Sequence, residues 1–168
     1  MGMRGPEMPE QEGKLDAGGK SFAIIASRFN DFVVEHLIKG ASDALLRMGA
    51  GEDSIELYRV PGAFEIPGVA CKLVDGGGFD GIICLGAVIR GATPHFDYVA
   101  GESAREIARL AARSPVPVIY GVLTTDTVEQ ALERATPKMG NKGGDAAMAA
   151  VEMAGLYAEL KRNRTPDA

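Results

Sequence analysis

Tryptophan is absent from this chain of 168 residues, and cysteine and histidine occur only twice each. Cys71 and Cys84 both lie in apolar stretches, so we expect buried free thiols and a reducing compartment. No cluster of cysteines and histidines has the spacing of a metal site. The sequence therefore predicts neither a disulfide-stabilised domain nor a metal centre of that kind.

The chain also lacks a run of basic residues and any long hydrophobic segment. Its formal net charge is -5 at pH 7, which argues against nucleic acid as a partner. No stretch is apolar enough to span a membrane, and Met1–Lys20 has no hydrophobic core of a signal peptide. We therefore expect a cytoplasmic protein with no nucleic-acid or membrane partner.

What the sequence does contain is an alternation of short apolar runs with amphipathic segments. The apolar runs predict strands over residues 22–26, 55–60, 82–89 and 116–123. Each run is followed by apolar residues at three- and four-residue spacing, which predicts a helix. The alternation predicts an α/β fold: a three-layer αβα sandwich with a four-stranded parallel, flavodoxin-like sheet and helices on both faces.

The two ends of the chain differ in composition from the middle. Residues 1–20 are rich in Gly, Pro, Glu and Lys, and we expect a flexible tail or tag remnant there. Residues 21–162 form the single predicted domain, and residues 163–168 a C-terminal tail. Within the domain, Gly140–Gly144 predicts a loop, after which Asp145 is expected to cap the last helix.

The most informative stretch runs from Gly81 to Tyr98. Its first half is almost continuously apolar, as in a central strand buried on both faces. Arg90 then ends the strand, and we expect a helix to start with the Thr93 hydroxyl as its cap and Pro94 in its first position. The free backbone amides of such a strand-to-helix turn favour an anion.

All exits of parallel strands lie along one edge of a sheet, and ligands bind at that edge. Here the edge would collect Arg28–Asn30, Ala63–Glu65, Arg90–His95 and Thr124–Asp126. No exit carries the glycine pattern of a dinucleotide fold, a phosphate-binding P-loop or a nucleophilic serine elbow. Arginines at the first and third exits also argue against a phospho-acceptor domain, which needs clustered aspartates.

Four motifs occur in the order and spacing of one enzyme family: Arg28-Phe29-Asn30-Asp31, Val60–Pro67, Leu85–Tyr98 and Gly140-Asn141-Lys142-Gly143. The chain resembles the 6,7-dimethyl-8-ribityllumazine synthases of riboflavin biosynthesis from about Phe22 to Leu160. The resemblance implies a transferase that condenses 5-amino-6-(D-ribitylamino)uracil with 3,4-dihydroxy-2-butanone 4-phosphate. The products would be 6,7-dimethyl-8-ribityllumazine, phosphate and water, and no metal or organic cofactor would be used.

The resemblance also assigns roles to matching residues. His95 would transfer protons and is the catalytic candidate, while Arg134 and the helix start at Ala92 and Thr93 would bind phosphate. Lys142 is a further candidate near the phosphate. The remaining substrate-binding candidates are the stacking ring of Phe29, the ribityl-binding segment Ala63, Phe64 and Glu65, the pyrimidine-binding backbone of Ala87, Val88 and Ile89, and Tyr120 from a neighbouring subunit.

The implied assembly is a homopentamer or a multiple of pentamers, with active sites between subunits and riboflavin synthase as a candidate partner. Three positions depart from the family pattern. Tyr120 stands where Phe is usual, and Ala87 where Thr is common. Thr136-Pro137 replaces the usual Gly-Thr in a loop tied to assembly, so this departure bears on oligomer size.

The chemistry of these residues suits this reaction even apart from the family resemblance. A phosphate dianion needs an arginine and backbone amides. Proton transfer near neutral pH suits histidine, whose ordinary pKa is about 6.5. Simpler structural roles exist as well: His95 as an ordinary first-turn residue, Glu65 and Arg134 as charges that complement helix dipoles, and Phe29 as part of the core.

Two other functions stay open from the sequence. One is a non-catalytic relative that binds flavin or lumazine, or serves chiefly as a shell subunit. The other is a different sugar-phosphate enzyme built on a similar sheet. The joint presence of His95 and Arg134 with Phe29 and Glu65 favours catalysis, because a binding module would not need a phosphate arginine.

Overall fold

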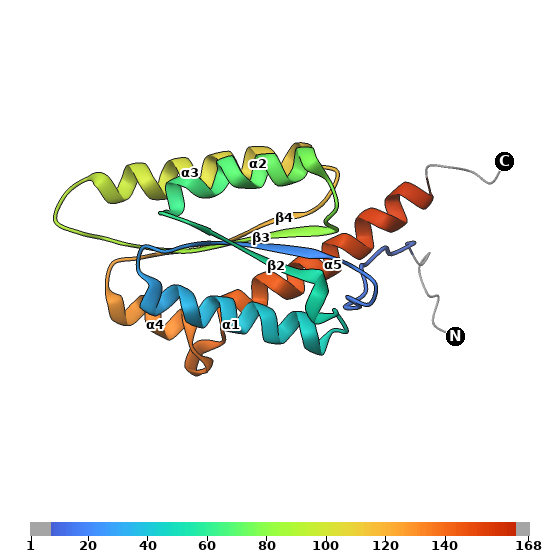
Figure 1. The fold of residues 1–168 in the computed structure, drawn as a ribbon, viewed down its shortest axis with the longest axis horizontal. Coiled ribbons are helices and arrows are strands. Elements are labelled where there is room, and N and C mark those ends of the chain that lie inside the picture. The colour runs from blue at the N-terminus through green and yellow to red at the C-terminus, as the bar shows by residue number, and fades with distance from the viewer. Residues whose placement is uncertain (1–7, 164–168) are drawn as a thin grey trace, which may run out of the picture.

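The sheet of this protein has four strands in the order β2-β1-β3-β4, and all neighbouring strands are parallel. The computed structural model describes residues 8–163, so residues 1–7 and 164–168 of the two expected tails lie outside it. The strands are β1 (Phe22–Ser27), β2 (Ile55–Val60), β3 (Gly81–Ile89) and β4 (Val118–Thr125). The predicted flavodoxin-like three-layer fold is confirmed (Figure 1).

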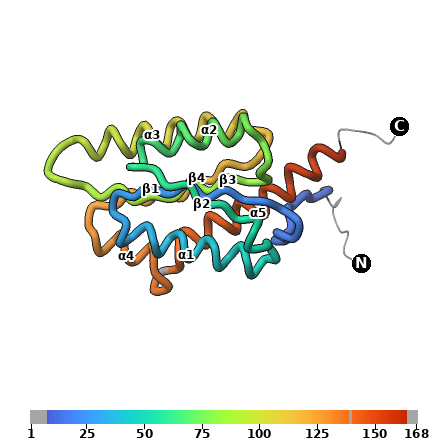
Figure 2. Tube along the Cα trace, viewed as in Figure 1, coloured from blue at the N-terminus to red at the C-terminus, as the bar shows by residue number. Residues whose placement is uncertain are grey.

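Helices cover both faces of the sheet (Figures 1 and 2). One face carries α1 (Asp31–Arg47), α4 (Val128–Ala135) and α5 (Lys142–Arg162). The other carries α2 (Ile66–Gly76) and α3 (His95–Arg113). Three short 3-10 helices complete the described chain: η1 (Glu52–Ser54), η2 (Ala63–Glu65) and η3 (Pro137–Met139). None of the helices in residues 8–163 is long and apolar enough to cross a membrane.

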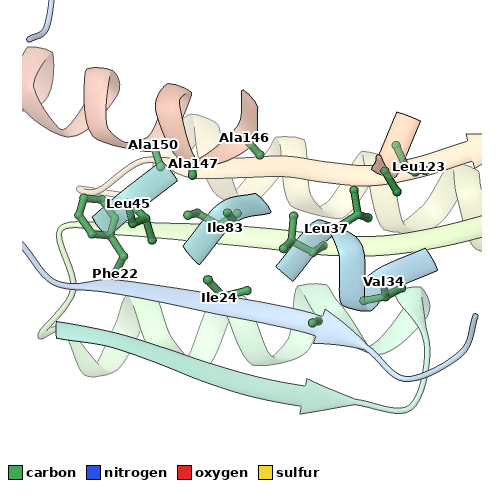
Figure 3. Close-up of a cluster of buried hydrophobic side chains, with 14 of the residues drawn as sticks. Phe22, Ile24, Val34, Leu37, Leu45, Ile83, Leu123, Ala146, Ala147 and Ala150 are labelled. Atoms are coloured by element: carbon green, nitrogen blue, oxygen red, sulfur yellow. The ribbon is translucent and has the colours of Figure 1, made fainter. Parts of the chain in front are cut away.

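Two hydrophobic layers hold the sheet between its helices. The layer under α1 and α5 contains Phe22, Ile24, Leu37, Leu45 and Ile83, all at most 1% exposed (Figure 3). Full burial of such a side chain stabilises the fold by about 1.5–3 kcal/mol. The opposite layer, under α2 and α3, is built from Ala23, Ile25, Ile66, Ile82, Cys84 and Ile107. The strands that carry the binding edge are therefore anchored from both sides.

The last strand lies two residues further along the chain than the sequence predicts, at Val118–Thr125 rather than at residues 116–123. Pro117 has no amide, and its carbonyl is used at the very start of the pairing, where it accepts from the Ile82 amide at 2.9 Å. As a consequence, Thr124 and Thr125 pair with Val88 and Ile89 and extend the sheet toward its carboxyl edge.

The last helix begins earlier than predicted, and Asp145 is not its cap. Helix α5 starts at Lys142, and the Asn141 side-chain oxygen accepts from the amides of Gly143 and Gly144 at 2.8 and 3.2 Å. A Cβ at Gly143 would lie 2.0 Å from the Leu37 carbonyl oxygen. The glycines that suggested a loop therefore allow α5 to cross α1 closely.

Part of the segment expected to be a tail contacts the domain. Ala17 is fully buried, and its amide donates to the Met48 carbonyl at 2.9 Å. A Cβ at Gly13 would lie 1.8 Å from the Glu152 carbonyl oxygen, so the chain passes directly over α5 there. The composition of residues 1–20 did not anticipate these contacts.

Candidate functional site

A cavity of about 630 Å³ opens at the carboxyl edge of the sheet. This volume lies within the usual range of small-molecule sites, about 300–1,000 Å³. It is formed by the exits of β1, β2 and β3 and by the first turns of α3. The lining residues are Phe29, Asn30, Pro61–Glu65, Ala87–Ile89, Gly91, Thr93, His95, Phe96, Tyr98 and Val99. The structure thus brings together the predicted Phe29, Ala63, Phe64, Glu65, Ala87, Val88, Ile89, Thr93 and His95.

The exit of β1 forms one side of this cavity. The Phe29 ring is 72% exposed at its rim, so it is not a core residue. The Phe29 amide donates to the Pro61 carbonyl at 3.1 Å, which fixes the exit of β1 against the exit of β2. Asn30 has a left-handed backbone with a φ of 59°, and its side-chain Nδ2 donates to the Ala87 carbonyl at 2.8 Å. Three strand exits are therefore joined around the ring.

The second side of the cavity is η2, between β2 and α2. Ala63 is buried and supports the turn, whereas Phe64 is 56% exposed. The Glu65 amide donates to the Gly62 carbonyl at 3.2 Å and closes the turn. The Glu65 carboxylate lies over Gly62, where a Cβ would approach Oε2 to 3.1 Å. An acceptor group is thus held beside the cavity by a tight backbone turn.

The third side is the start of α3, which differs slightly from the prediction. The helix begins at His95 with Pro94 as its N-cap, so Thr93 lies before the cap and does not close the helix. No described side chain caps this helix start. The Asp97 amide donates to the Pro94 carbonyl at 3.0 Å, which leaves the amides of His95 and Phe96 open to an anion at the cavity wall.

Two titratable side chains at the cavity, those of Glu65 and His95, have no hydrogen-bond or ion-pair partner within residues 8–163. A free carboxylate accepts hydrogen bonds from ligand hydroxyls, and a free imidazole can take and return a proton. Across the same residues, no group of three or more His, Cys, Asp or Glu side chains is placed to hold a metal ion.

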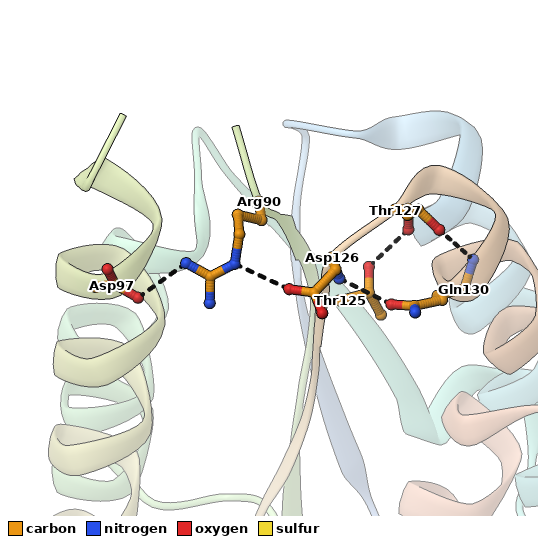
Figure 4. Close-up of polar contacts among 6 residues, drawn as sticks. All are labelled: Arg90, Asp97, Thr125, Asp126, Thr127 and Gln130. Atoms are coloured by element: carbon orange, nitrogen blue, oxygen red, sulfur yellow. Dashed lines mark hydrogen bonds and ion pairs between the residues drawn. The ribbon is translucent and has the colours of Figure 1, made fainter. Parts of the chain in front are cut away.

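Arg90 lies just outside the cavity, with its guanidinium held between two carboxylates (Figure 4). Nε donates to Asp126 Oδ1 at 2.9 Å, and Nη1 lies 3.4 Å from Asp97 Oδ1. The guanidinium also lies 4.3 Å from the centre of the Phe96 ring. The hydrogen bond to Asp126 and the two negative charges raise the pKa of Arg90. This arginine is therefore a link between strand exits and α3.

Three predicted site residues do not line the cavity. Tyr120 is 40% exposed in a second cavity of about 530 Å³ on the β4 side of α3. Burial raises the pKa of its hydroxyl, which keeps the phenol protonated. Arg134 is exposed on α4 and donates from Nη1 to the carbonyl of Gln130, which lines that second cavity, at 3.0 Å. Ala92 is exposed in the loop before α3.

The additional candidate Lys142 also lies outside both cavities. Its Nζ pairs with Asp145 Oδ2 at 2.8 Å in the first turn of α5. This exposed pair gives Lys142 a local partner of opposite charge. A single copy of the chain therefore does not bring this lysine to the cavity.

Several residues of the cavity were missed as site residues from the sequence. Asn30 was expected at the binding edge, directly after Phe29 in the motif, but no role in the site was assigned to it. Tyr98 and Val99 follow His95 by one helical turn, and this spacing places them on the same face of α3. That periodicity was a usable signal, whereas the sequence held none for the long-range bond of Asn30.

Comparisons with known proteins point to one family. The family model described as 6,7-dimethyl-8-ribityllumazine synthase matches residues 19–158. A relative from Desulfatibacillum aliphaticivorans is 55% identical over 150 residues, which cover 89% of this chain and 97% of the relative. One from Clostridium kluyveri is 54% identical over 154 residues, covering 92% and 100%. Both relatives are named 6,7-dimethyl-8-ribityllumazine synthase.

Proposed function

This chain belongs to the 6,7-dimethyl-8-ribityllumazine synthase family, and from that premise we propose how its residues carry out the reaction. The enzyme condenses 5-amino-6-(D-ribitylamino)uracil with 3,4-dihydroxy-2-butanone 4-phosphate. It releases 6,7-dimethyl-8-ribityllumazine, phosphate and water, the penultimate step of riboflavin biosynthesis. The proposal assigns each substrate to a part of the cavity at the carboxyl edge of the sheet.

The pyrimidine is placed between the Phe29 ring and the backbone of Ala87–Ile89. The exposed ring at the cavity rim supports this placement, since stacking adds about 0.5–1.5 kcal/mol beyond area burial. The ribityl chain then extends along Ala63–Glu65. The unpartnered Glu65 carboxylate is suited to accept hydrogen bonds from its hydroxyls.

The butanone phosphate is placed at the start of α3, near Ala92 and Thr93. The uncapped amides of this helix supply donors for the phosphate oxygens, and the helix dipole favours the negative charge. His95, at the first position of the helix, is then close enough to transfer protons during imine formation and ring closure. Holding both substrates together supplies most of the acceleration, because the amine is already a nucleophile.

The strongest support for the proposal is that the expected site residues form two separate groups on one copy of the chain. Tyr120 lines the second cavity, and Arg134 on α4 donates to Gln130 in the wall of that cavity, so neither residue lines the cavity of Phe29 and His95. Family membership implies an oligomer, and we assign Tyr120 and Arg134 to the cavity of a neighbouring copy. Such a head-to-tail contact closes into a ring, here a homopentamer. The exposed rings of Phe29, Phe64 and Tyr98 offer apolar surface for that contact.

Two further assignments rest on the family resemblance alone. The cytoplasm is the proposed location of the enzyme, and riboflavin synthase is the proposed protein partner. The reaction proposed for the cavity depends on neither of these two assignments.

The reaction is tested by mixing both substrates with purified protein without added metal. Absorbance and fluorescence follow the lumazine product, and a separate assay follows released phosphate. We expect both products in equal amounts. Tight binding of lumazine or flavin without turnover would instead indicate a binding module. The molar mass in solution, measured by light scattering, is expected to correspond to five chains or a multiple of five.

A further inference from the structure

Asn30 stands at the N-cap of α1 but does not use its side chain as a cap. Its backbone carbonyl accepts from the amides of Val33 and Val34 at 3.0 and 3.1 Å, as expected at a helix start. An asparagine in this position ordinarily accepts a further amide with its side-chain oxygen. Here no such bond forms, and Nδ2 instead donates to the Ala87 carbonyl at 2.8 Å. The side chain is thus diverted from the helix to β3.

The Ala87 carbonyl needs this donor because β1 ends too early to supply one. The pairing of β1 with β3 ends at Ala26 and Leu85, whereas β3 continues to Ile89 beside β4. From Gly86 onward, the edge of β3 that faces β1 therefore has no paired strand. Backbone groups alternate between the two sides of a strand, so the N–H and C=O of Ile89 face the same side as those of Ala87. Ile89 lines the cavity.

We propose that Asn30 is a positioning residue for the pyrimidine, an inference that rests on the placement of that ring between Phe29 and β3. The side-chain amide of Asn30 fixes the exit of β1 to β3, and the Phe29 amide fixes the same exit to Pro61. The Phe29 ring is then held at a set distance from the free backbone groups of Ile89. Because Asn30 occupies the Ala87 carbonyl, the ligand is directed to Ile89.

Because the backbone of Asn30 is left-handed, its side chain can be changed without a change in backbone conformation. Asn30→Gly keeps a φ of 59° without strain and removes only the side-chain donor. Asn30→Asp keeps the shape and places a carboxylate oxygen against the Ala87 carbonyl. Ser54→Ala is the matched control, since the Ser54 hydroxyl donates to the Gly51 carbonyl at 2.7 Å at the opposite end of the strands.

Steady-state kinetics with each substrate varied in turn test the assignment. We expect Asn30→Gly to raise the KM for ribitylaminouracil about tenfold. The Ala87 carbonyl loses its hydrogen-bond donor in this variant, and the Phe29 ring is no longer held against β3. The KM for the butanone phosphate is expected to stay within about twofold. Asn30→Asp should act in the same direction and at least as strongly. Ser54→Ala should change neither constant.

A purely structural role would lower the unfolding midpoint of Asn30→Gly and leave both KM values unchanged, and this result would overturn the inference. Failure of both Asn30 variants to fold, with Ser54→Ala folded, would overturn it as well. Phe29→Ala distinguishes a failure of the proposed pyrimidine placement from a failure of the proposed role of Asn30. If Phe29→Ala also leaves the pyrimidine KM unchanged, the proposed placement of the pyrimidine fails. If it raises that KM and Asn30→Gly does not, only the role of Asn30 fails.

Discussion

Arg90 and Asp126 tie the exit of β3 to the exit of β4 through a hydrogen bond of 2.9 Å from Nε to Oδ1. Asp97, in the first turn of α3, lies on the other side of the same guanidinium at 3.4 Å. A guanidinium with two carboxylate partners is neutralised locally and is poorly suited to bind a phosphate dianion. Arg134 pairs with no carboxylate among the described residues, so it is the better phosphate ligand.

We expect Arg90→Gln to lower kcat while the KM for the butanone phosphate stays within about twofold. The reason is that the start of α3, which carries His95, loses its tie to β4. The unfolding midpoint should move little, because exposed ion pairs contribute little to stability. Arg105→Gln, which removes an exposed pair with Glu102 further along α3, is the control. A selective rise in the phosphate KM would show that Arg90 binds phosphate after all.

Arg134→Ala is expected to raise the KM for the butanone phosphate at least about tenfold, since a charge-assisted hydrogen bond is lost. The KM for ribitylaminouracil should change far less. Arg134→Lys should recover part of the loss, because it keeps the charge without the fork of donors. Initial rates with each substrate varied in turn provide the measurement. Equal effects on the two constants would contradict a phosphate role.

His95→Ala is expected to lower kcat about 100-fold, the usual size of a lost acid–base catalyst. The exposed, unpartnered imidazole contributes little to folding, so circular dichroism and oligomer mass should be unchanged. The other histidine of the chain supplies the control: His36 is exposed on α1 and does not line the cavity, and His36→Ala should retain full turnover. Unchanged turnover in His95→Ala would assign the proton transfers to solvent or substrate.

Much of the cavity could be predicted because it follows from local patterns. Apolar runs mark the strands, and a parallel sheet places their exits on one edge, so Phe29, Glu65, Val88 and His95 meet without knowledge of the strand order. Helix periodicity would also have supplied Tyr98. These features depend on residues close together in sequence.

The remaining features depend on contacts between distant segments, which the sequence does not display. Gly143 looked like a loop residue because glycine disfavours helices, yet α5 needs it to pass the Leu37 carbonyl. Asn30 was expected at the binding edge without a defined partner, yet its side chain donates to the Ala87 carbonyl in another strand. The family resemblance already assigned Tyr120 to a neighbouring subunit, whereas the separation of Arg134 from the cavity became visible only with the fold.

If the active site lies between copies, two impaired variants should restore part of each other's activity when mixed. His95→Ala keeps the Arg134 face, and Arg134→Ala keeps the His95 face. After the two are unfolded and refolded together in equal amounts, about one quarter of the contacts in a ring of heterologous interfaces would carry both intact residues. At a butanone phosphate concentration well below the wild-type KM, we therefore expect activity near one quarter of wild type, while each variant refolded alone stays at about one tenth or less. A mixture no more active than its components would place both residues in one subunit.

The two cysteines are expected to differ sharply in reactivity and in their effect on stability at high pH. Burial raises the pKa of the Cys84 thiol from an ordinary value of 9.0 to about 12. The expected burial of Cys71 is wrong, because this residue lies on the exposed side of α2. A thiol reagent at pH 8 should therefore modify Cys71 in the native protein and Cys84 only after unfolding, because the thiolate is the reactive form.

Above pH 9 the unfolded chain loses the Cys84 proton before the folded chain does, so the free energy of unfolding falls as pH rises toward 12. Cys84→Ala removes this component, although it leaves a small cavity that lowers stability at every pH. Urea unfolding at pH 8 and pH 10 should therefore show a smaller loss in the variant than in the wild type. Equal losses would mean that the thiol is not shielded from water in the assembled enzyme.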